Sequence, residues 1–182
     1  DGDLYVAGNY TNGGDTFADG GFNLYLSGAD IQLNNYIASV GTTVTLDGTA
    51  QTLRETSSNL FTLRNIVFAG SGAKTFTDGN DAATILGNFT INTGVEVGIN
   101  RNISIAGNFT NNGTFNQTAN TLTFNGVAAQ SIVTNLTTTF FGLDFTTGGA
   151  KTFTVEGAVI NGNINIAGGN TVNMGVFDYT LG

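Results

Sequence analysis

Hydrophobic and polar residues alternate over short runs along most of this chain, and Gly and Asn stand at the breaks. Alternation with a period of two predicts half-buried β-strands, and no segment shows the spacing of three and four that an amphipathic helix requires. The predicted strands are Leu4–Gly8, Phe22–Leu26, Thr43–Leu46, Leu60–Phe68, Lys74–Thr77, Thr84–Asn92, Val95–Ile99, Ile103–Thr110, Thr121–Phe124, Thr138–Phe145, Lys151–Val155, Val159–Ile166, Val172–Val176 and Tyr179–Leu181. We therefore expect an all-β protein.

One strand-like phrase that ends in Ala-Gly recurs along the chain. It occurs at Leu4–Gly8, Ile103–Gly107 and Ile164–Gly168, and Gly87–Thr90 matches Gly107–Thr110. The successive intervals between the four glycines of these segments are close to four, one and three times a single unit of roughly 20 residues. A fixed period in this range indicates a solenoid, in which each unit buries its apolar face by stacking on its neighbours.

A longer repeat accompanies this period. Gly72–Thr77 returns unchanged as Gly149–Thr154, and Thr43–Gly48 returns in similar form as Thr121–Gly126. The repeat unit is about 77 residues long, and its copies lie around 43–77 and 121–154. No linker of different composition separates the copies, so we expect one continuous domain over 1–182.

Two architectures fit such a repeat. One is a parallel β-helix of about nine coils with roughly 20 residues in each coil, and the alternative is a tandem pair of β-sandwiches. The glycines that mark the shorter repeat recur at one, three and four times the same unit of roughly 20 residues, which favours the β-helix. The strands of a sandwich are not expected to repeat at one fixed spacing.

Composition narrows the possible functions. The net charge is −8, and the five Lys and Arg residues are scattered, whereas nucleic-acid binding needs clustered cations. No apolar run is long enough for membrane insertion. The chain has no His and no Cys, which removes Ser-His and Cys-His nucleophiles and the usual zinc ligands. We expect no enzymatic activity, no cofactor and no metal.

Several segments together resemble a known bacterial pattern: Gly107–Asn116, Thr121–Gly126, Ala128–Ile132, Phe140–Leu143 and Val172–Gly182. The chain is similar to the β-strand-repeat regions of very large bacterial secreted and surface proteins, which are common in Bacteroidetes. The resemblance implies a right-handed parallel β-helix, a location at the cell surface or outside the cell, and a role as adhesin, stalk or fibre. Those regions have no catalytic signature to transfer. Residues 14–35 and 54–59 depart from the pattern.

Strand-like sequence reaches both ends of the chain, without an amphipathic helix or a polar coil to cap it. A β-helix exposes strand edges and core at its ends. The expected partner is therefore the protein itself, as a head-to-tail polymer, or flanking coils of a longer solenoid. The candidate contact residues are Leu4, Val6, Tyr179 and Leu181.

Two other functions stay open as alternatives. The first is a carbohydrate-binding or carbohydrate-cleaving β-helix, although carboxylates such as Asp30, Asp47 and Asp144 stand singly. The second is an ice-binding surface, because Thr-x-Thr pairs occur at Thr43/Thr45, Thr75/Thr77, Thr121/Thr123 and Thr152/Thr154. Their wide spacing favours ordinary outward-facing Thr.

Surface glycans are a further possible partner. Glycosylation sequons begin at Asn9, Asn88, Asn102, Asn108, Asn112, Asn116 and Asn135.

Overall fold

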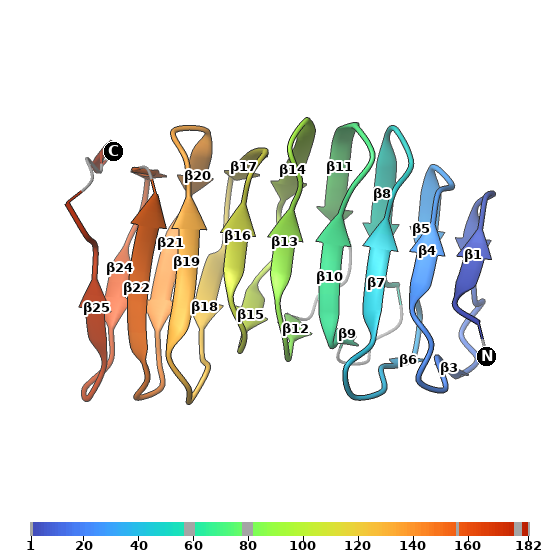
Figure 1. Ribbon diagram of the computed structural model, residues 1–182, viewed down its shortest axis with the longest axis horizontal. Helices are drawn as coiled ribbons and strands as arrows, with labels where there is room; N and C mark the ends of the chain where they lie inside the picture. Colours follow the sequence, from blue (N-terminus) through green and yellow to red (C-terminus); the bar gives the residue numbers. More distant parts are fainter. Residues whose placement is uncertain (1, 57–60, 78–81, 156, 177–179, 182) are drawn as a thin grey trace.

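The computed structural model describes residues 2–56, 61–77, 82–155, 157–176 and 180–181. These residues form an all-β solenoid without helices, in which the strands stack in parallel along one long axis (Figure 1). In Figure 1 the strands of the front sheet point upward, and the chain returns behind them while it advances from right to left. This path is a right-handed coil, so the predicted right-handed parallel β-helix is confirmed.

Three main sheets form the faces of the solenoid, and a short fourth sheet completes its first coils. Sheet A contains β1 (Leu4–Val6), β4 (Leu24–Leu26), β7 (Thr43–Leu46), β10 (Asn65–Phe68), β13 (Phe89–Ile91), β16 (Phe109–Asn111), β19 (Gln130–Thr134), β22 (Ala150–Val155) and β25 (Thr171–Asn173). Sheet B contains β2 (Tyr10–Thr11), β5 (Asp30–Gln32), β8 (Gln51–Arg54), β11 (Gly72–Thr77), β14 (Val95–Ile99), β17 (Thr114–Gln117), β20 (Thr138–Phe140), β23 (Val159–Ile160) and β26 (Thr180–Leu181). Sheet D contains β9 (Phe61–Leu63), β12 (Ala83–Ile85), β15 (Ile103–Ile105), β18 (Thr121–Phe124), β21 (Gly142–Phe145) and β24 (Ile164–Ile166). Sheet C is the pair β3 (Phe17–Ala18) and β6 (Tyr36–Ile37), which lies in the divergent segment 14–35 and just after it.

Within each sheet, neighbouring strands lie one turn apart in the chain and pair in parallel. Leu4 pairs with Leu24, and Ile66 pairs with Phe89. The interval along the chain between paired residues is three residues longer in the second pair than in the first. The nine strands of sheet A span eight turns of about 21 residues. The expected period of roughly 20 residues is therefore slightly short, and it is an average, because the corners differ in length.

Alternate side chains of all faces point inward and fill the core with aliphatic and Phe side chains. Phe89 and Phe109, which pair in sheet A, stack with ring centroids 5.5 Å apart. Phe124 and Phe145 do the same in sheet D at 5.6 Å. The core is therefore built from columns of like residues along the axis, and aromatic pairs of this kind stabilise beyond the area they bury.

Five predicted strands are in fact two strands on adjacent faces. The segments are Leu60–Phe68 (of which Leu60 lies outside the described residues), Thr84–Asn92, Ile103–Thr110, Thr138–Phe145 and Val159–Ile166. A single residue, Arg64, separates β9 from β10, so the inward-outward alternation hides the corner. The prediction missed the short strands β2, β3, β5 and β6, and also β8, β17 and β19.

Some glycines stand at corners where successive coils approach closely, among them Gly107 of the recurring Ala-Gly phrase. A Cβ atom on Gly107 would lie 2.4 Å from the carbonyl carbon and oxygen of Gly87, one turn earlier. A Cβ atom on Gly28 would lie 2.2 Å from the carbonyl oxygen of Gly8. No side chain fits at these distances, so Gly107 and Gly28 are needed because the backbone of the neighbouring coil occupies the space. By contrast, a Cβ atom on Gly8 or Gly168, which end other copies of the Ala-Gly phrase, would have no other atom within 4 Å.

The longer sequence repeat does not correspond to whole coils. Gly72–Thr77 is β11 in sheet B, but its repeat Gly149–Thr154 lies in and beside β22 in sheet A. Likewise β7 in sheet A is repeated as β18 in sheet D. Both pairs are eleven strands apart, which at three strands per turn is three and two-thirds turns. The repeat of about 77 residues is therefore not a whole number of coils, and the motif returns on a different face.

Candidate functional site

The first strand of the solenoid leaves core-facing side chains open to solvent. β1 pairs with β4 on one side, and Leu4 stands in register with Leu24. Leu24 is 1% exposed, whereas Leu4 is 38% exposed. Val6 packs partly buried against the core from the same strand. Both predicted contact residues on β1 therefore lie at the edge, where a further coil would cover them.

Tyr5 adds an aromatic surface to this edge. Its ring stacks on Tyr25 of the next coil, with centroids 4.7 Å apart and planes inclined by 8°. Tyr5 itself is 69% exposed. The ring is covered on the side of Tyr25, so a preceding coil would find a ready stacking surface on the other side.

The opposite end has the same character. In β24, Ile164 and Ile166 continue the inward columns of Leu143 and Phe145. They are 40% and 51% exposed, although both residues beneath them are buried. On the neighbouring sheet, β25 is the last strand and its Val172 is partly buried. The apolar core thus reaches the surface at both ends.

The other two predicted contact residues are less well placed. Tyr179 lies outside the described residues. The backbone of Leu181 belongs to β26, where it pairs with Ile160, while its side chain lies outside the described part of the structure. Sequence reasoning missed Ile164 and Ile166, because the shape of the last coils decides which residues are uncovered.

A buried polar pair fills one corner of the solenoid. Gln51 donates hydrogen bonds from Nε2 to the carbonyls of Leu26 and Gly28, both at 2.7 Å. Lys74, in register with Gln51 one turn later, donates from Nζ to the carbonyl of Gly48 at 2.5 Å. These long side chains satisfy carbonyls that the corner removes from the sheets. Burial lowers the pKa of Lys74, and Asp47 partly opposes this.

The sequence repeat places a second such pair on another face. Gln130 accepts from the backbone NH of Gly126 and donates to the carbonyls of Ile105 and Gly107. Lys151, in register with Gln130, donates to the carbonyl of Gly126 at 2.7 Å. Burial lowers the pKa of the Lys151 amine. Both pairs have structural partners throughout, so they act as corner supports.

A carboxylate cluster supports the corner beside sheet C. Asp19 is buried and accepts hydrogen bonds from the Tyr36 hydroxyl at 2.6 Å, the Thr42 hydroxyl at 2.8 Å and the backbone NH groups of Ser39 and Gly21. Burial by itself would raise the pKa of Asp19, but these donors outweigh it and hold the pKa well below its usual range. Burial and the bond to Asp19 raise the pKa of Tyr36. The pair is thus fixed as carboxylate and phenol at neutral pH.

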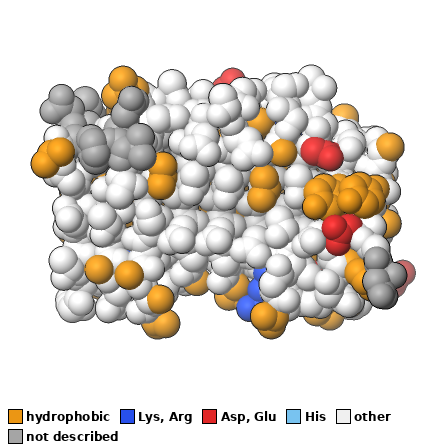
Figure 2. Space-filling view, in the orientation of Figure 1, with side chains coloured by type: hydrophobic (Ala, Val, Ile, Leu, Met, Phe, Trp, Pro, Cys, Tyr) orange, Lys and Arg blue, Asp and Glu red, His pale blue; other side chains and the backbone are white. Residues whose placement is uncertain are grey.

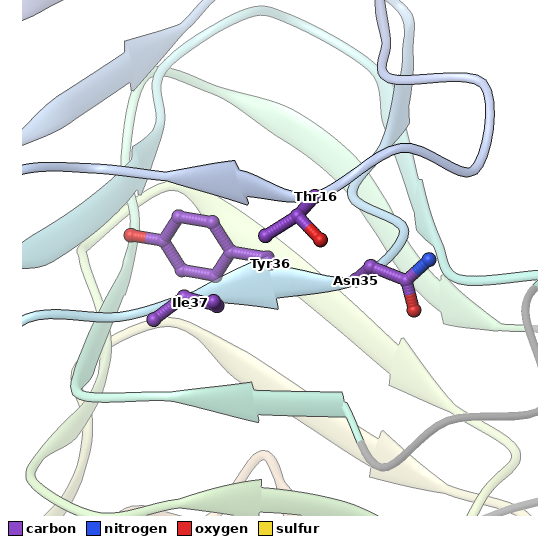
Figure 3. A pocket seen from close by; sticks show the side chains of 4 residues that line it. All are labelled: Thr16, Asn35, Tyr36 and Ile37. Carbon is purple, nitrogen blue, oxygen red and sulfur yellow. The ribbon is translucent and has the colours of Figure 1, made fainter.

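Next to this cluster is an open cavity of about 370 Å³, lined by Thr16, Asn35, Tyr36 and Ile37. Figure 3 shows the Tyr36 ring crossing between β3 and β6, with Thr16 on one side and Ile37 on the other. The Tyr36 hydroxyl is occupied by Asp19, and Asn35 Nδ2 donates to the carbonyl of Gly14 at 2.5 Å. The polar groups of Tyr36 and Asn35 in this cavity therefore serve the fold.

Two further hollows lie on sheet B. One, of about 290 Å³, is lined by Gly72, Ala73, Gly94, Val95, Glu96, Gly113 and Thr114. The other, of about 240 Å³, is lined by Thr75, Gly98, Ile99, Asn100, Asn116 and Thr118. In the second hollow, Gly98 stands in register between Thr75 and Asn116, so the outward column lacks a side chain there. Glu96 is the one carboxylate among these lining residues.

The carboxylates of the sequence do not converge in the described residues. Asp30 forms an ion pair with Arg54 at 2.5 Å across adjacent coils. In the described part of the chain, no three His, Cys, Asp or Glu residues are grouped so that they could hold a metal ion. The same residues include no helix with the length and hydropathy needed to span a membrane.

The seven sequon asparagines differ in their surroundings. Asn9, Asn88, Asn102 and Asn108 are exposed, and their Oδ1 atoms accept hydrogen bonds from backbone NH groups of the next coil. Asn112 and Asn116 are also exposed. Asn135 is half-buried, and its Nδ2 donates to the carbonyls of Asn111 and Gly113. Because a glycan is attached to Nδ2, Asn135 is the least suitable acceptor of the seven.

Comparison with known proteins adds no relative to this description. The chain matches no protein-family model, no curated protein and no solved structure.

Proposed function

We propose that this chain is a structural rod of an extracellular filament or adhesin stalk. Its coils stack at each end on further coils of the same kind, which come either from another copy or from the continuation of a longer solenoid. The observation that supports this proposal is the state of the two ends: Leu4 at one and Ile164 and Ile166 at the other continue buried columns into solvent.

The energetic argument follows from burial. Covering a side chain such as Ile166 contributes about 1.5–3 kcal/mol when it is removed fully from water. Each end also presents a strand edge with backbone groups directed along the axis, which another parallel strand can pair. A contact between unlike ends does not close on itself, so it produces a linear filament.

The body of the solenoid suits a mechanical role. Hydrogen bonds between strands run along the long axis on every face, so a pulling force is shared among parallel sheets. The resemblance to bacterial surface repeats supports a position outside the cell, where a densely hydrogen-bonded rod resists proteolysis.

Imaging and sedimentation test the proposal together. Purified protein is examined by negative-stain electron microscopy and by sedimentation velocity over a wide concentration range. We expect fibres of uniform width whose length grows with concentration. Short rods that remain monodisperse at every concentration would contradict stacking through the ends.

A further inference from the structure

The outward surface of sheet A is a regular lattice that the sequence does not reveal. Strand pairing aligns Thr45, Val67, Thr90, Thr110, Val133 and Thr154 in one column over six successive coils, in which Thr45 is buried and the other five are partly exposed. Every member is β-branched, and Thr and Val have nearly the same shape. From Val67 to Thr154 the column therefore presents the same γ-methyl outline in each coil.

A second column runs beside the first, two residues earlier on each strand. Its members are Thr43, Asn65, Asn88, Asn108, Ser131 and Thr152, all small, uncharged and able to form hydrogen bonds. The spacing is about 4.8 Å between strands and about 6.6–6.8 Å between the two columns, as the geometry of a parallel sheet dictates.

Hydrogen bonds between coils hold the second column rigid. Asn65 Oδ1 accepts from the backbone NH of Asn88, and Asn88 Oδ1 accepts from Asn108, both at 2.9 Å. Asn108 Oδ1 in turn accepts from Ser131 at 2.8 Å. β-Branched side chains in the first column have restricted χ1 angles. Ladders of this kind also favour a flat sheet, and the strands of sheet A run side by side with little change of direction (Figure 1).

Neither column contains a charged residue. Figure 2 looks onto this sheet, and its red and blue side chains lie toward the margins while the middle of the face is uncharged. The other faces carry shorter uncharged columns. On sheet D the outward residues Thr62, Thr84, Ser104 and Thr123 align over four coils before Asp144 interrupts them. The outward column of sheet B combines Asp30, Gly98 and Val159. Strand propensity alone would treat all three faces alike, so the greater length of the uncharged array on sheet A calls for a separate explanation.

The chemistry of the face excludes most partners. Nucleic acid and anionic lipid need Lys or Arg, which both columns lack. Protein partners are usually anchored by aromatic or Arg side chains in pockets, and sugar chains by aromatic rings, yet the two columns offer neither. A rigid, neutral array of methyl, hydroxyl and amide groups instead suits a neutral lattice that repeats on the same scale. Ice presents such a lattice of oxygen atoms.

We propose that the outward face of sheet A, between β7 and β22, binds the surface of ice. Two Thr-x-Thr pairs of the sequence, Thr43/Thr45 and Thr152/Thr154, lie at the two ends of this surface, whereas Thr75/Thr77 and Thr121/Thr123 lie on sheets B and D. The array is formed by the mixed columns, in which Val, Asn and Ser fill the positions between threonines. This inference is independent of stacking through the ends.

The test compares one substitution on two faces. Thr90 lies in the first column of sheet A, and Thr84 lies at an outward position of sheet D, each between two buried neighbours of its strand. Both can be replaced by Tyr, which strands accept readily. Circular dichroism and thermal unfolding establish that each variant is folded. Inhibition of ice recrystallisation and thermal hysteresis are then measured.

We expect the unmodified protein to inhibit ice growth, Thr90→Tyr to lose this activity, and Thr84→Tyr to retain it. Absence of activity in the unmodified protein, or equal losses in both variants, would overturn the proposal. Binding to crystalline cellulose or chitin that Thr90→Tyr abolishes, without any effect on ice, would overturn it in favour of a polysaccharide surface.

Discussion

Lys74 and Lys151 occupy the same position in two copies of one sequence segment, yet they lie on different faces of the solenoid. Each is buried and donates to a backbone carbonyl at a corner. Their surroundings differ in one charge: Asp47 accompanies Lys74, whereas the repeat has Asn125 in its place. The pair is thus a natural comparison of a buried amine with and without a nearby carboxylate.

Replacing Asn125 by Asp should stabilise the fold by supplying the missing carboxylate to Lys151. We expect a gain of up to about 1 kcal/mol in the free energy of unfolding, since the new group is only partly buried. Urea denaturation at neutral pH measures it. The reciprocal variant Asp47→Asn should lose a similar amount, and a loss in Asn125→Asp would contradict the electrostatic interpretation.

The depressed pKa of Lys151 predicts how stability depends on pH. Because its pKa is lower in the folded state, the unfolded chain binds more protons in the interval below about 10.4, the ordinary Lys value. The free energy of unfolding should therefore rise as the pH increases from 7 toward 10, and Lys74 acts in the same direction. Tyr36, with a raised pKa, opposes this only where free Tyr ionises, near pH 10.

Comparison with Lys151→Met isolates this contribution. The variant should show a smaller increase in stability over the same pH interval, measured by urea denaturation at several pH values. An unchanged slope would mean that Lys151 keeps its ordinary pKa in the folded protein.

Two half-buried glycines should respond oppositely to Ala. Gly107→Ala places a Cβ atom 2.4 Å from the backbone of Gly87, so the coils must separate. We expect a loss of about 1–3 kcal/mol, as for other strained core sites. A Cβ atom on Gly98 would have no other atom within 4 Å, and Gly98→Ala should be neutral or stabilising by up to about 1 kcal/mol. Thermal unfolding of the two variants compares them directly.

A charge at the first strand should interrupt assembly. Leu4→Asp places a carboxylate in the apolar column that another coil would cover, so we expect shorter fibres or none, with an unchanged far-ultraviolet spectrum. Val127→Asp is the matched control, because Val127 is exposed at a corner in the middle of the solenoid. Fibre length by negative-stain microscopy is the measurement, and equal effects of both variants would argue against stacking through the ends.

Much of the fold follows from local sequence patterns. Alternation in Val95–Ile99 and Thr121–Phe124 predicts strands that the structure confirms with the same bounds. The recurring Ala-Gly phrase predicts stacked coils by its spacing, and at Gly107 the close approach of the neighbouring backbone demands Gly. The corners between faces could not be predicted in this way. The alternation of inward and outward residues continues through Arg64 without a break, so β9 and β10 were predicted as one strand.

By itself, the sequence determined that this chain is an all-β solenoid, since alternation and corner glycines act within a few residues. Which residues share a face was decided only by the tertiary structure. Turns of unequal length shift the register by different amounts, so Thr90 and Val67 become neighbours through pairing that no fixed period predicts. The same shifts place Lys74 and Lys151 on different faces, and the packing of whole coils leaves Ile166 uncovered.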